Sequence, residues 1–280
     1  MIRGLYTGAS GMKTQQEQMN NIANNLSNLN TTSYKRDTTV FKAFPEMLLR
    51  RMNDDEIYKY PMGSVDQGNI IGKLGTGVET NEVYTQFEQG GIQHTEDHFD
   101  FALEGRGFFT IETPRGIAYT RNGTFMIDKN NYLVTKEGDY VLGEKGRIQV
   151  QTNNFEVNED GAIMVNADLY QPGERVVENR ENNWNGAMVI DRFRIADFRE
   201  LRGLRKQGNS LYSATKLSGS ERTARVRPKV LQGMLETSNV NPVTEMTRMI
   251  EVNRMYEASS KTIQAHDRAL EQLINSVARV

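Results

Sequence analysis

The sequence predicts an α+β fold, with paired coiled-coil-like helices at the N- and C-termini and a central antiparallel all-β domain. Two observations support this prediction. Apolar residues recur with a seven-residue repeat over residues 2 to 26 and again over residues 246 to 277, as they do in coiled coils. In the middle of the chain, turn-forming residue pairs follow one another mostly at intervals of seven or eight residues, which is typical of consecutive β-hairpins.

The N-terminal repeat predicts a helix that ends in a cluster of asparagines. Its two seam positions are apolar except at Gln16, and they are occupied by Ile2, Leu5, Ala9, Met12, Gln16, Met19, Ala23 and Leu26. Asn24, Asn25, Asn28 and Asn30 follow closely. Because asparagine readily adopts the left-handed conformation that closes helices and opens turns, we expect the helix to end there.

The centre of the chain is divided by turn signals. They are Arg115-Gly116, Asn122-Gly123, Asn130-Asn131, Glu137-Gly138, Lys145-Gly146 and Asp160-Gly161. Between them lie short runs rich in β-branched and aromatic residues, including 108–111, 117–120 and 132–135. Such runs favour strands, so we expect hairpins in an antiparallel sandwich or open barrel.

The C-terminal helix has a clear start signal. Asn241 can cap the helix, Pro242 suits its first position, and Glu245 places a negative charge near the positive end of the helix dipole. One seam position of its repeat is apolar throughout, with Met249, Tyr256, Ile263, Leu270 and Val277. The other seam position includes three polar residues, which predicts a narrow, register-specific seam.

These patterns divide the chain into three regions. Residues 1–33 and 236–280 are assigned to a terminal helical assembly core, and residues 81–205 to the central β domain. Residues 34–80 and 206–235 show neither period clearly and are assigned to a connecting region. The apolar seam of one helix buries too little surface to offset the entropy of ordering its residues. We therefore expect both termini to be largely disordered in the free monomer and to fold on assembly.

Composition excludes several classes of protein. The formal net charge is -2 over 280 residues, which gives no general case for nucleic-acid binding. The chain has no cysteine, which excludes disulfides and thiolate metal sites. A hydrophobic fraction of 37% and a mean hydropathy of -0.62 argue against one large core. Neither a membrane-spanning apolar run nor a cleaved signal peptide is recognisable.

Charge is segregated locally although it is balanced overall. Residues 79 to 112 hold eight acidic residues against Arg106 alone, a net charge of -7. Residues 192 to 229 hold eleven basic residues against three acidic ones, a net charge of +8. Two solvated faces or an internal pairing would explain this distribution. The alternative is charge complementarity between neighbouring subunits, which would set their register.

An enzymatic or metal-binding role finds little support. His94 and His98, with acidic residues beside them, would share one face only in a helix, and Gly90-Gly91 and a strand-like run flank them. Glu104 and Glu112 are the nearest candidates for a pair of wall-cleaving carboxylates, and nothing around them indicates a pocket. We therefore predict no enzymatic activity, no metal and no cofactor. A coiled-coil scaffold or adhesin would explain the repeats but not the asparagine-rich junctions.

Three motifs stand in order along nearly the whole chain. Residues 23–36 read Ala-Asn-Asn-Leu-Ser-Asn-Leu-Asn-Thr-Thr-Ser-Tyr-Lys-Arg, and residues 233–241 read Gly-Met-Leu-Glu-Thr-Ser-Asn-Val-Asn. Residues 103–109, 119–125 and 133–135 form the central motif. Together they resemble the bacterial flagellar rod and hook axial proteins, whose N-terminal signature typically reads A-N-N-L-A-N-x-N-T-x-G-F-K-R. The ordered combination is far more specific than any one motif.

The resemblance implies a structural role in the bacterial flagellum. Such a protein would polymerise helically into the basal-body rod, the drive shaft that transmits torque from rotor to hook. Implied partners are further copies of the chain, the neighbouring proximal rod proteins, the hook protein, the surrounding ring proteins and the flagellar type III export apparatus. Export by that apparatus would deliver the chain to the periplasmic space without a cleaved signal peptide. The distal rod segment is favoured over the neighbouring proximal segment, and a hook-type subunit is a further alternative.

We expect the assembly interface to combine the apolar seams with the asparagines at the helix ends. The expected residues are Leu5, Met12, Met19, Asn24, Asn25, Leu26, Asn28, Asn239, Asn241, Met249, Tyr256, Ile263 and Leu270. The apolar members would pack helix against helix, within one subunit or between neighbours. The asparagine amides would bond exposed backbone at the helix ends. An ordinary intramolecular hairpin with ordinary capping would leave the same pattern, so both interpretations remain open.

The chain departs from the resembled family at a few positions. Ser33 and Tyr34 stand where the family usually has glycine and phenylalanine, and without glycine a positive φ at position 33 is less expected. Residues 180–186, which include the single tryptophan, Trp184, have no counterpart that we can place.

Overall fold

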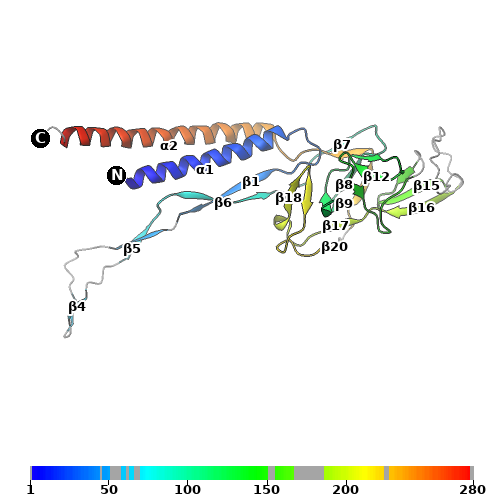
Figure 1. The fold of residues 1–280 in the computed structure, drawn as a ribbon, viewed down its shortest axis with the longest axis horizontal. Helices are drawn as coiled ribbons and strands as arrows, with labels where there is room; N and C mark the ends of the chain where they lie inside the picture. The colour runs from blue at the N-terminus through cyan, green and yellow to red at the C-terminus, as the bar shows by residue number, and fades with distance from the viewer. Residues whose placement is uncertain are drawn as a thin grey trace. The chain divides into compact units, whose positions relative to one another are not determined.

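The computed structural model describes residues 2–44, 46–50, 58–60, 63–65, 70–150, 155–166, 186–223 and 227–277. They form two helices and a β-rich centre with antiparallel pairing (Figure 1). This confirms the predicted α+β class. Trp184 lies outside the described residues. The chain divides into two compact units, which are Met1–Leu26, Asp37–Tyr84 and Val243–Val280 for unit 1, and Ser27–Arg36 and Thr85–Pro242 for unit 2.

Both predicted helices are present, and their ends fall where the sequence indicates. Helix α1 covers Ile2–Ser27 and ends inside the asparagine cluster. Helix α2 covers Pro242–Val277 and carries Glu245 in its first turn. Within unit 1 the two helices lie side by side and antiparallel (Figure 1). In the described part of the chain, no helix is long and apolar enough to cross a lipid bilayer.

Two-stranded ribbons complete unit 1. Strand β1 (Asp37–Ala43) pairs with β6 (Val78–Thr85), β2 (Met47–Arg50) with β5 (Ile70–Leu74), and β3 (Tyr58–Tyr60) with β4 (Gly63–Val65). The segment around β1 and β6 contacts α1. Thr7 Oγ1 donates a hydrogen bond to the Thr76 carbonyl at 2.9 Å, and Asn21 Nδ2 donates to Thr39 Oγ1 at 2.8 Å. Helix α1 therefore contacts both α2 and this extended segment.

Unit 2 is built around a nine-stranded sheet. Its main path is β11 (Phe125–Ile127), β12 (Leu133–Thr135), β13 (Tyr140–Val141), β9 (Phe108–Thr113), β10 (Gly116–Thr120), β19 (Leu211–Ser213) and β18 (Arg205–Gly208). Strand β17 (Ile195–Asp197) joins through β9 and in turn pairs with β20 (Arg222–Thr223). A short 3-10 helix, η2 (Leu201–Gly203), lies between β17 and β18 in the sequence.

In its described residues, unit 2 also contains three smaller sheets. Strands β14 (Phe155–Val157), β15 (Ala162–Asn166) and β16 (Ala187–Arg192) form a three-stranded sheet. Strand β21 (Lys229–Gln232) pairs with β8 (Phe101–Glu104), and β22 (Met234–Glu236) pairs with β7 (Ile92–His94). The last two pairs bring the segment before α2 against the start of the β region.

The predicted turns lie between segments that pair with each other, except Asn122-Gly123, which separates β10 from β11, and these two strands pair with other strands instead. The β9–β10 hairpin closes beside Arg115 with Thr113 opposite Gly116. Asn131, with φ of 62°, lies between β11 and β12, and Gly138, with φ of 90°, lies between β12 and β13. Both positions need the left-handed region, which glycine and asparagine adopt at low cost.

The segments expected to be connections contain strands. Residues 206–235 contribute to β18 to β22, and residues 34–80 contribute to β1 to β6. The strands of the 206–235 segment are only two to four residues long. A period of two needs a longer run to become visible.

The main core of unit 2 is aromatic. Phe101, Phe109, Phe125 and Phe193 are almost fully buried, and their ring centroids lie 5.1 to 6.3 Å apart. These offset and edge-on contacts add to the apolar area that the rings remove from water. Truncating one such ring to alanine typically costs about 3 to 5 kcal/mol.

A second, smaller cluster lies elsewhere in unit 2. Phe108, Tyr119, Phe198 and Tyr212 are buried together, and Phe87 packs against them. Tyr212 comes from the segment that the sequence analysis assigns to a connection. The residues predicted to connect the domains therefore contribute to the core of unit 2, together with residues of the predicted β domain.

Candidate assembly interface

Helices α1 and α2 approach each other through glycines of α1. A Cβ added to Gly4 would lie 2.7 Å from His266 Nε2, and one added to Gly8 would lie 2.9 Å from Ile263 Cγ1. Gly11 faces Ser259 in the same way, with 3.5 Å to its Oγ. Since these glycines are spaced by four and three residues, they share one helix face. Sequence reasoning missed this face because glycine does not count as apolar in a seam. Its regular spacing was the available signal.

The predicted apolar interface residues lie on the two helices in a half-buried state. Leu5, Met12, Met19 and Leu26 of α1, and Met249, Tyr256, Ile263 and Leu270 of α2, are all partly buried in the single chain. Ile263 lies against Gly8. Their packing between neighbouring subunits stays a prediction.

The predicted asparagines differ in their surroundings. Asn25 is 1% exposed and joins the end of α1 to β1, because its Nδ2 donates to the Asp37 carbonyl at 2.9 Å and its Oδ1 accepts from the Asp37 amide at 3.0 Å. Asn28 Oδ1 accepts from Thr31 Oγ1 at 3.2 Å in the turn that follows α1. Asn24 and Asn241 have exposed side chains.

Asn239 belongs to a group of polar residues where the first and third motifs meet in unit 2. We call Ser33, Lys35, Arg121, Glu236 and Asn239 the polar cluster. Four of these five residues are buried, and Asn239 is partly buried. Sequence reasoning assigned no role to the first four, since a lysine, an arginine and a glutamate are usually solvated.

A buried ion pair lies at the centre of the polar cluster. Lys35 Nζ is 2.6 Å from Glu236 Oε1, and the two side chains are 1% and 0% exposed. Arg121 Nη1 lies 3.6 Å from Glu236 Oε2. The same Glu236 carboxylate accepts from the Gly90 amide at 2.9 Å, and Lys35 Nζ also donates to the Glu88 carbonyl at 2.7 Å. The carboxylate is thus held by two cations and a backbone amide.

Burial perturbs the cations of this cluster. Desolvation lowers the pKa of Lys35, and the Glu236 carboxylate opposes that shift. Desolvation likewise lowers the pKa of Arg121. Because removing one partner of a buried ion pair leaves an uncompensated charge, such a change typically costs about 3 to 5 kcal/mol.

Asn239 bonds backbone groups of the first motif and of the segment after β6. Its Oδ1 accepts from the Arg36 amide at 2.8 Å, and its Nδ2 donates to the Gln86 carbonyl at 2.9 Å. Its own amide donates to the Tyr34 carbonyl at 3.3 Å. The partners of the amide side chain therefore lie in the first motif and in the segment after β6, and they are not backbone groups of a helix end.

The expectation for position 33 is wrong. Ser33 has a φ of 56° although it is not glycine. Its amide donates to the Glu236 carbonyl and its Oγ to the Arg121 carbonyl, each at 2.8 Å. These buried hydrogen bonds compensate the cost of the left-handed conformation.

The residues weighed for enzymatic chemistry do not assemble a site. His94 and His98 are exposed, at the end of β7 and in the turn after it. Glu112 pairs with Arg147 at 2.7 Å, and this hydrogen bond lowers the pKa of Glu112. Among the residues that the structure describes, no group of three acidic or histidine side chains is placed to hold a metal ion.

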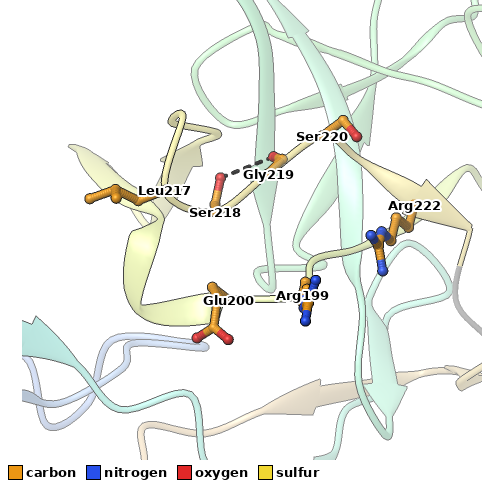
Figure 2. A pocket seen from close by; sticks show the side chains of 7 residues that line it. All are labelled: Arg199, Glu200, Leu217, Ser218, Gly219, Ser220 and Arg222. Carbon is orange, nitrogen blue, oxygen red and sulfur yellow. Dashed lines mark hydrogen bonds between the residues drawn. The ribbon is translucent and has the colours of Figure 1, made fainter.

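A basic pocket lies in the positively charged segment of unit 2. Its volume is about 410 Å³, and it is lined by Arg199, Glu200, Leu217, Ser218, Gly219, Ser220 and Arg222. Figure 2 shows the two arginines beside a loop that is held by a 3.2 Å hydrogen bond from Ser218 Oγ to the Gly219 carbonyl. Leu217 is 82% exposed. Exposed arginines beside an exposed leucine are more typical of a surface that contacts another protein than of a pocket that binds a small substrate.

Unit 1 has an apolar groove on α1. Its volume is about 630 Å³, and Tyr6 and Ala9 of α1 line it together with Phe44, Met47 and Val78. The side chains of Tyr6, Met47 and Val78 are 67%, 46% and 41% exposed. Contiguous exposed apolar surface of this kind marks interaction sites.

Comparisons with known proteins agree with the order of the motifs. Residues 5–35 match the family described as Flagella basal body rod protein, residues 102–165 the Flagellar hook protein FlgE/F/G D1 domain, and residues 231–276 the Flagellar basal body rod FlgEFG protein C-terminal. Lys35 and Glu236 therefore lie in separate matched segments.

Full-length relatives are also found. The flagellar basal-body rod protein FlgG of Buchnera aphidicola subsp. Schizaphis graminum is 33% identical over 98% of this chain and 99% of its own length. The flagellar hook-basal body complex protein FlhO of Bacillus subtilis is 31% identical over 100% of both chains. The FlgG protein of Borreliella burgdorferi is 35% identical over 96% of this chain and 97% of its own length.

Proposed function

The chain belongs to the FlgE/F/G family of flagellar basal-body rod and hook proteins, and we infer from this membership that it is a structural subunit of the flagellar basal-body rod. The family is structural, so the chain is not an enzyme. The observation that carries this conclusion is the match of the whole chain to rod proteins at about a third identity.

Polymerisation through the terminal helices is the proposed mechanism. The half-buried seams of α1 and α2 and the apolar groove leave surface that a further copy of the chain can cover. Two different surfaces of one chain that fit each other generate an open helical polymer when the rotation between neighbouring copies does not close into a ring. In such a polymer the helices would form coiled-coil contacts, and torque would pass through many small contacts in parallel.

The proposed setting is the distal rod. Two of the three relatives described above are named FlgG, which supports the distal segment over the proximal one or the hook. The partners would then be further copies of the chain, neighbouring proximal rod proteins, the hook protein and ring proteins around the shaft. The type III export apparatus would bring the chain to the periplasm.

Charge complementarity between copies is part of this proposal. The basic pocket exposes Arg199 and Arg222, while Glu82, Glu88 and Glu96 of the acidic segment are exposed. Contacts between such surfaces would favour one register between neighbours and contribute less to affinity.

A matched pair of substitutions tests the role of the helices. Met246 on α2 and Met126 on β11 are each 51% exposed. We expect Met246→Glu to abolish motility and prevent rod completion, because Met246 is the first seam residue of the apolar repeat over residues 246 to 277 and the substitution places a charge there. Met126→Glu should leave both unchanged. Motility in soft agar and electron microscopy of basal bodies provide the readout, and normal motility of the Met246→Glu strain would contradict the mechanism.

A further inference from the structure

We propose that the polar cluster makes folding of the first motif conditional on the third, so that residues 33–36 stay open until residues 236–239 bind them. In a rod subunit, this conditional folding would keep incomplete chains from assembling. Its biological use therefore rests on the proposed function. The folding claim itself concerns the single chain.

The partners of residues 33–36 come from distant parts of the sequence. Glu236 accepts from the amide of Ser33 and from Lys35 Nζ, and Asn239 accepts from the amide of Arg36. These contacts span 201 to 203 residues. Loop closure over such a length must be compensated by the contacts that it permits.

The first motif is unfavourable in its folded conformation without these partners. Ser33 holds a φ of 56°, and the Lys35 ammonium is 1% exposed. A buried cation without its counter-charge is costly, and a left-handed serine adds strain. Before Glu236 is in place, both residues are therefore more stable in water.

The dependence is mutual. The Asn239 amide donates to the Tyr34 carbonyl, and Asn239 Oδ1 accepts from Arg36. Lys206 Nζ adds a third segment, since it donates to the Lys35 carbonyl at 2.9 Å and lies 4.5 Å from the centre of the Tyr34 ring. Residues 33–36 and 236–239 consequently form or lose their structure together.

The two halves of the polar cluster lie near opposite ends of the sequence, so the coupling distinguishes complete chains from incomplete ones. The first motif contains the end of α1 and the turn after it, and the third directly precedes α2. Chains are made from the N-terminus, so the first motif emerges about 200 residues before its partners. An incomplete chain cannot close the cluster, and only a nearly complete chain presents both helices beside folded motifs.

Pulse-labelling hydrogen exchange during refolding of the full chain tests the order directly. We expect the amides of residues 33–36 and 236–239 to become protected in the same kinetic phase, not earlier than the core strands β9 and β10. Protection of residues 33–36 in an earlier phase than residues 236–239 would overturn the proposal.

Equilibrium exchange on variants tests the mutual dependence. In Glu236→Gln, which removes the charge but keeps the shape, residues 33–36 should exchange at least about tenfold faster while β9 and β10 keep their protection. Lys35→Met should have the same effect on residues 236–239. The control is Glu159→Gln, which breaks an exposed ion pair with Lys229 in the same unit and should leave both segments protected.

Faster exchange of residues 33–36 in Glu236→Gln has two possible causes, which are loss of the coupling and unfolding of the whole of unit 2. If Glu236→Gln also exposes the core, Asn239→Ala provides the comparison, because it removes backbone hydrogen bonds without leaving a buried charge. Unchanged protection of residues 33–36 in Asn239→Ala would then overturn the coupling. These measurements use dilute monomer, so their failure would leave the rod assignment untouched, and a failed motility test would leave the coupling untouched.

Discussion

Ser33 shows how single residues of the first motif are held by the rest of unit 2. Its side chain is 0% exposed, and its Oγ donates to the Arg121 carbonyl across 88 residues of sequence. The residue therefore combines a conformation that favours glycine with a hydrogen bond that glycine cannot make.

Substitutions at Ser33 separate these two effects. Ser33→Ala keeps the strained φ and loses the Oγ hydrogen bond, so it should lower the free energy of unfolding by about 1 to 3 kcal/mol. Ser33→Gly loses the same hydrogen bond but relieves the strain, and it should be more stable than Ser33→Ala by about 1 kcal/mol. Urea denaturation of the variants checks the order, and a Ser33→Gly variant less stable than Ser33→Ala would contradict it.

Tyr119 gives the chain a defined response to alkaline pH. It is 5% exposed, and its hydroxyl donates to Glu221 Oε2 at 3.0 Å. Burial, followed by the negative charge of Glu221, raises the pKa of Tyr119 from 10.0 to about 12. Between these values the unfolded state binds fewer protons than the folded state, so the free energy of unfolding falls as pH rises.

The fall attributable to Tyr119 should be at most about 1.4 kcal/mol per pH unit, and Tyr119→Phe should remove it. Phenolate absorbance, titrated in both chains, should show one tyrosine with a pKa near 12 that is missing from the variant. A difference titration centred near 10 would show that Tyr119 is not perturbed.

At the scale of elements, the contact between α1 and α2 depends on glycine. Gly8 and Gly11 occupy the same helix face, but an added Cβ meets Ile263 at 2.9 Å in the first case and Ser259 at 3.5 Å in the second. The first distance requires Ile263 to move, whereas the second is an ordinary contact.

These distances predict opposite results for two substitutions. Gly11→Ala should stabilise α1 by up to about 1 kcal/mol, because alanine is the better helix former. Gly8→Leu should separate the helices and reduce polymerisation. Circular dichroism and sedimentation of the assembled protein provide the measurement. Polymerisation of Gly8→Leu at the level of the unsubstituted chain would show that the close approach is not required.

The terminal helices are expected to depend on assembly. Their seams are only half-buried within one chain, and apolar burial of that extent does not offset the entropy of ordering a helix. Amide exchange in dilute monomer should therefore be fast over residues 2–26 and 243–277 and slow in the core strands of unit 2. Slow exchange at both termini of the monomer would show that the helices form without a partner.

Local signals in the sequence predicted most of the elements and few of the distant contacts. Asn130-Asn131 and Glu137-Gly138 mark hairpins because a turn is set by its own residues. The pairing of Lys229 with Glu104 joins strands 125 residues apart, and no local pattern encodes such a partner. The burial of Lys35 was equally hidden, since a lysine followed by an arginine is usually solvated.

At the scale of the whole molecule, three sequence motifs predicted the family, whereas the sequence did not predict which surfaces of the folded chain stay exposed for assembly. The structure joins two of the motifs inside unit 2 through Lys35 and Glu236. These two motif positions therefore contribute to the fold of the chain itself. The surfaces proposed for assembly are the half-buried seams and the groove beside Tyr6.

Electron microscopy of purified flagellar basal bodies, from cells with the gene deleted and then restored, tests the central claim most directly. The chain is a structural subunit of the rod, and we propose the distal segment for it, so deletion should leave a rod that ends after its proximal part, without hook or filament, and restoration should recover both. Complete rods and hooks in the deletion strain would contradict this account.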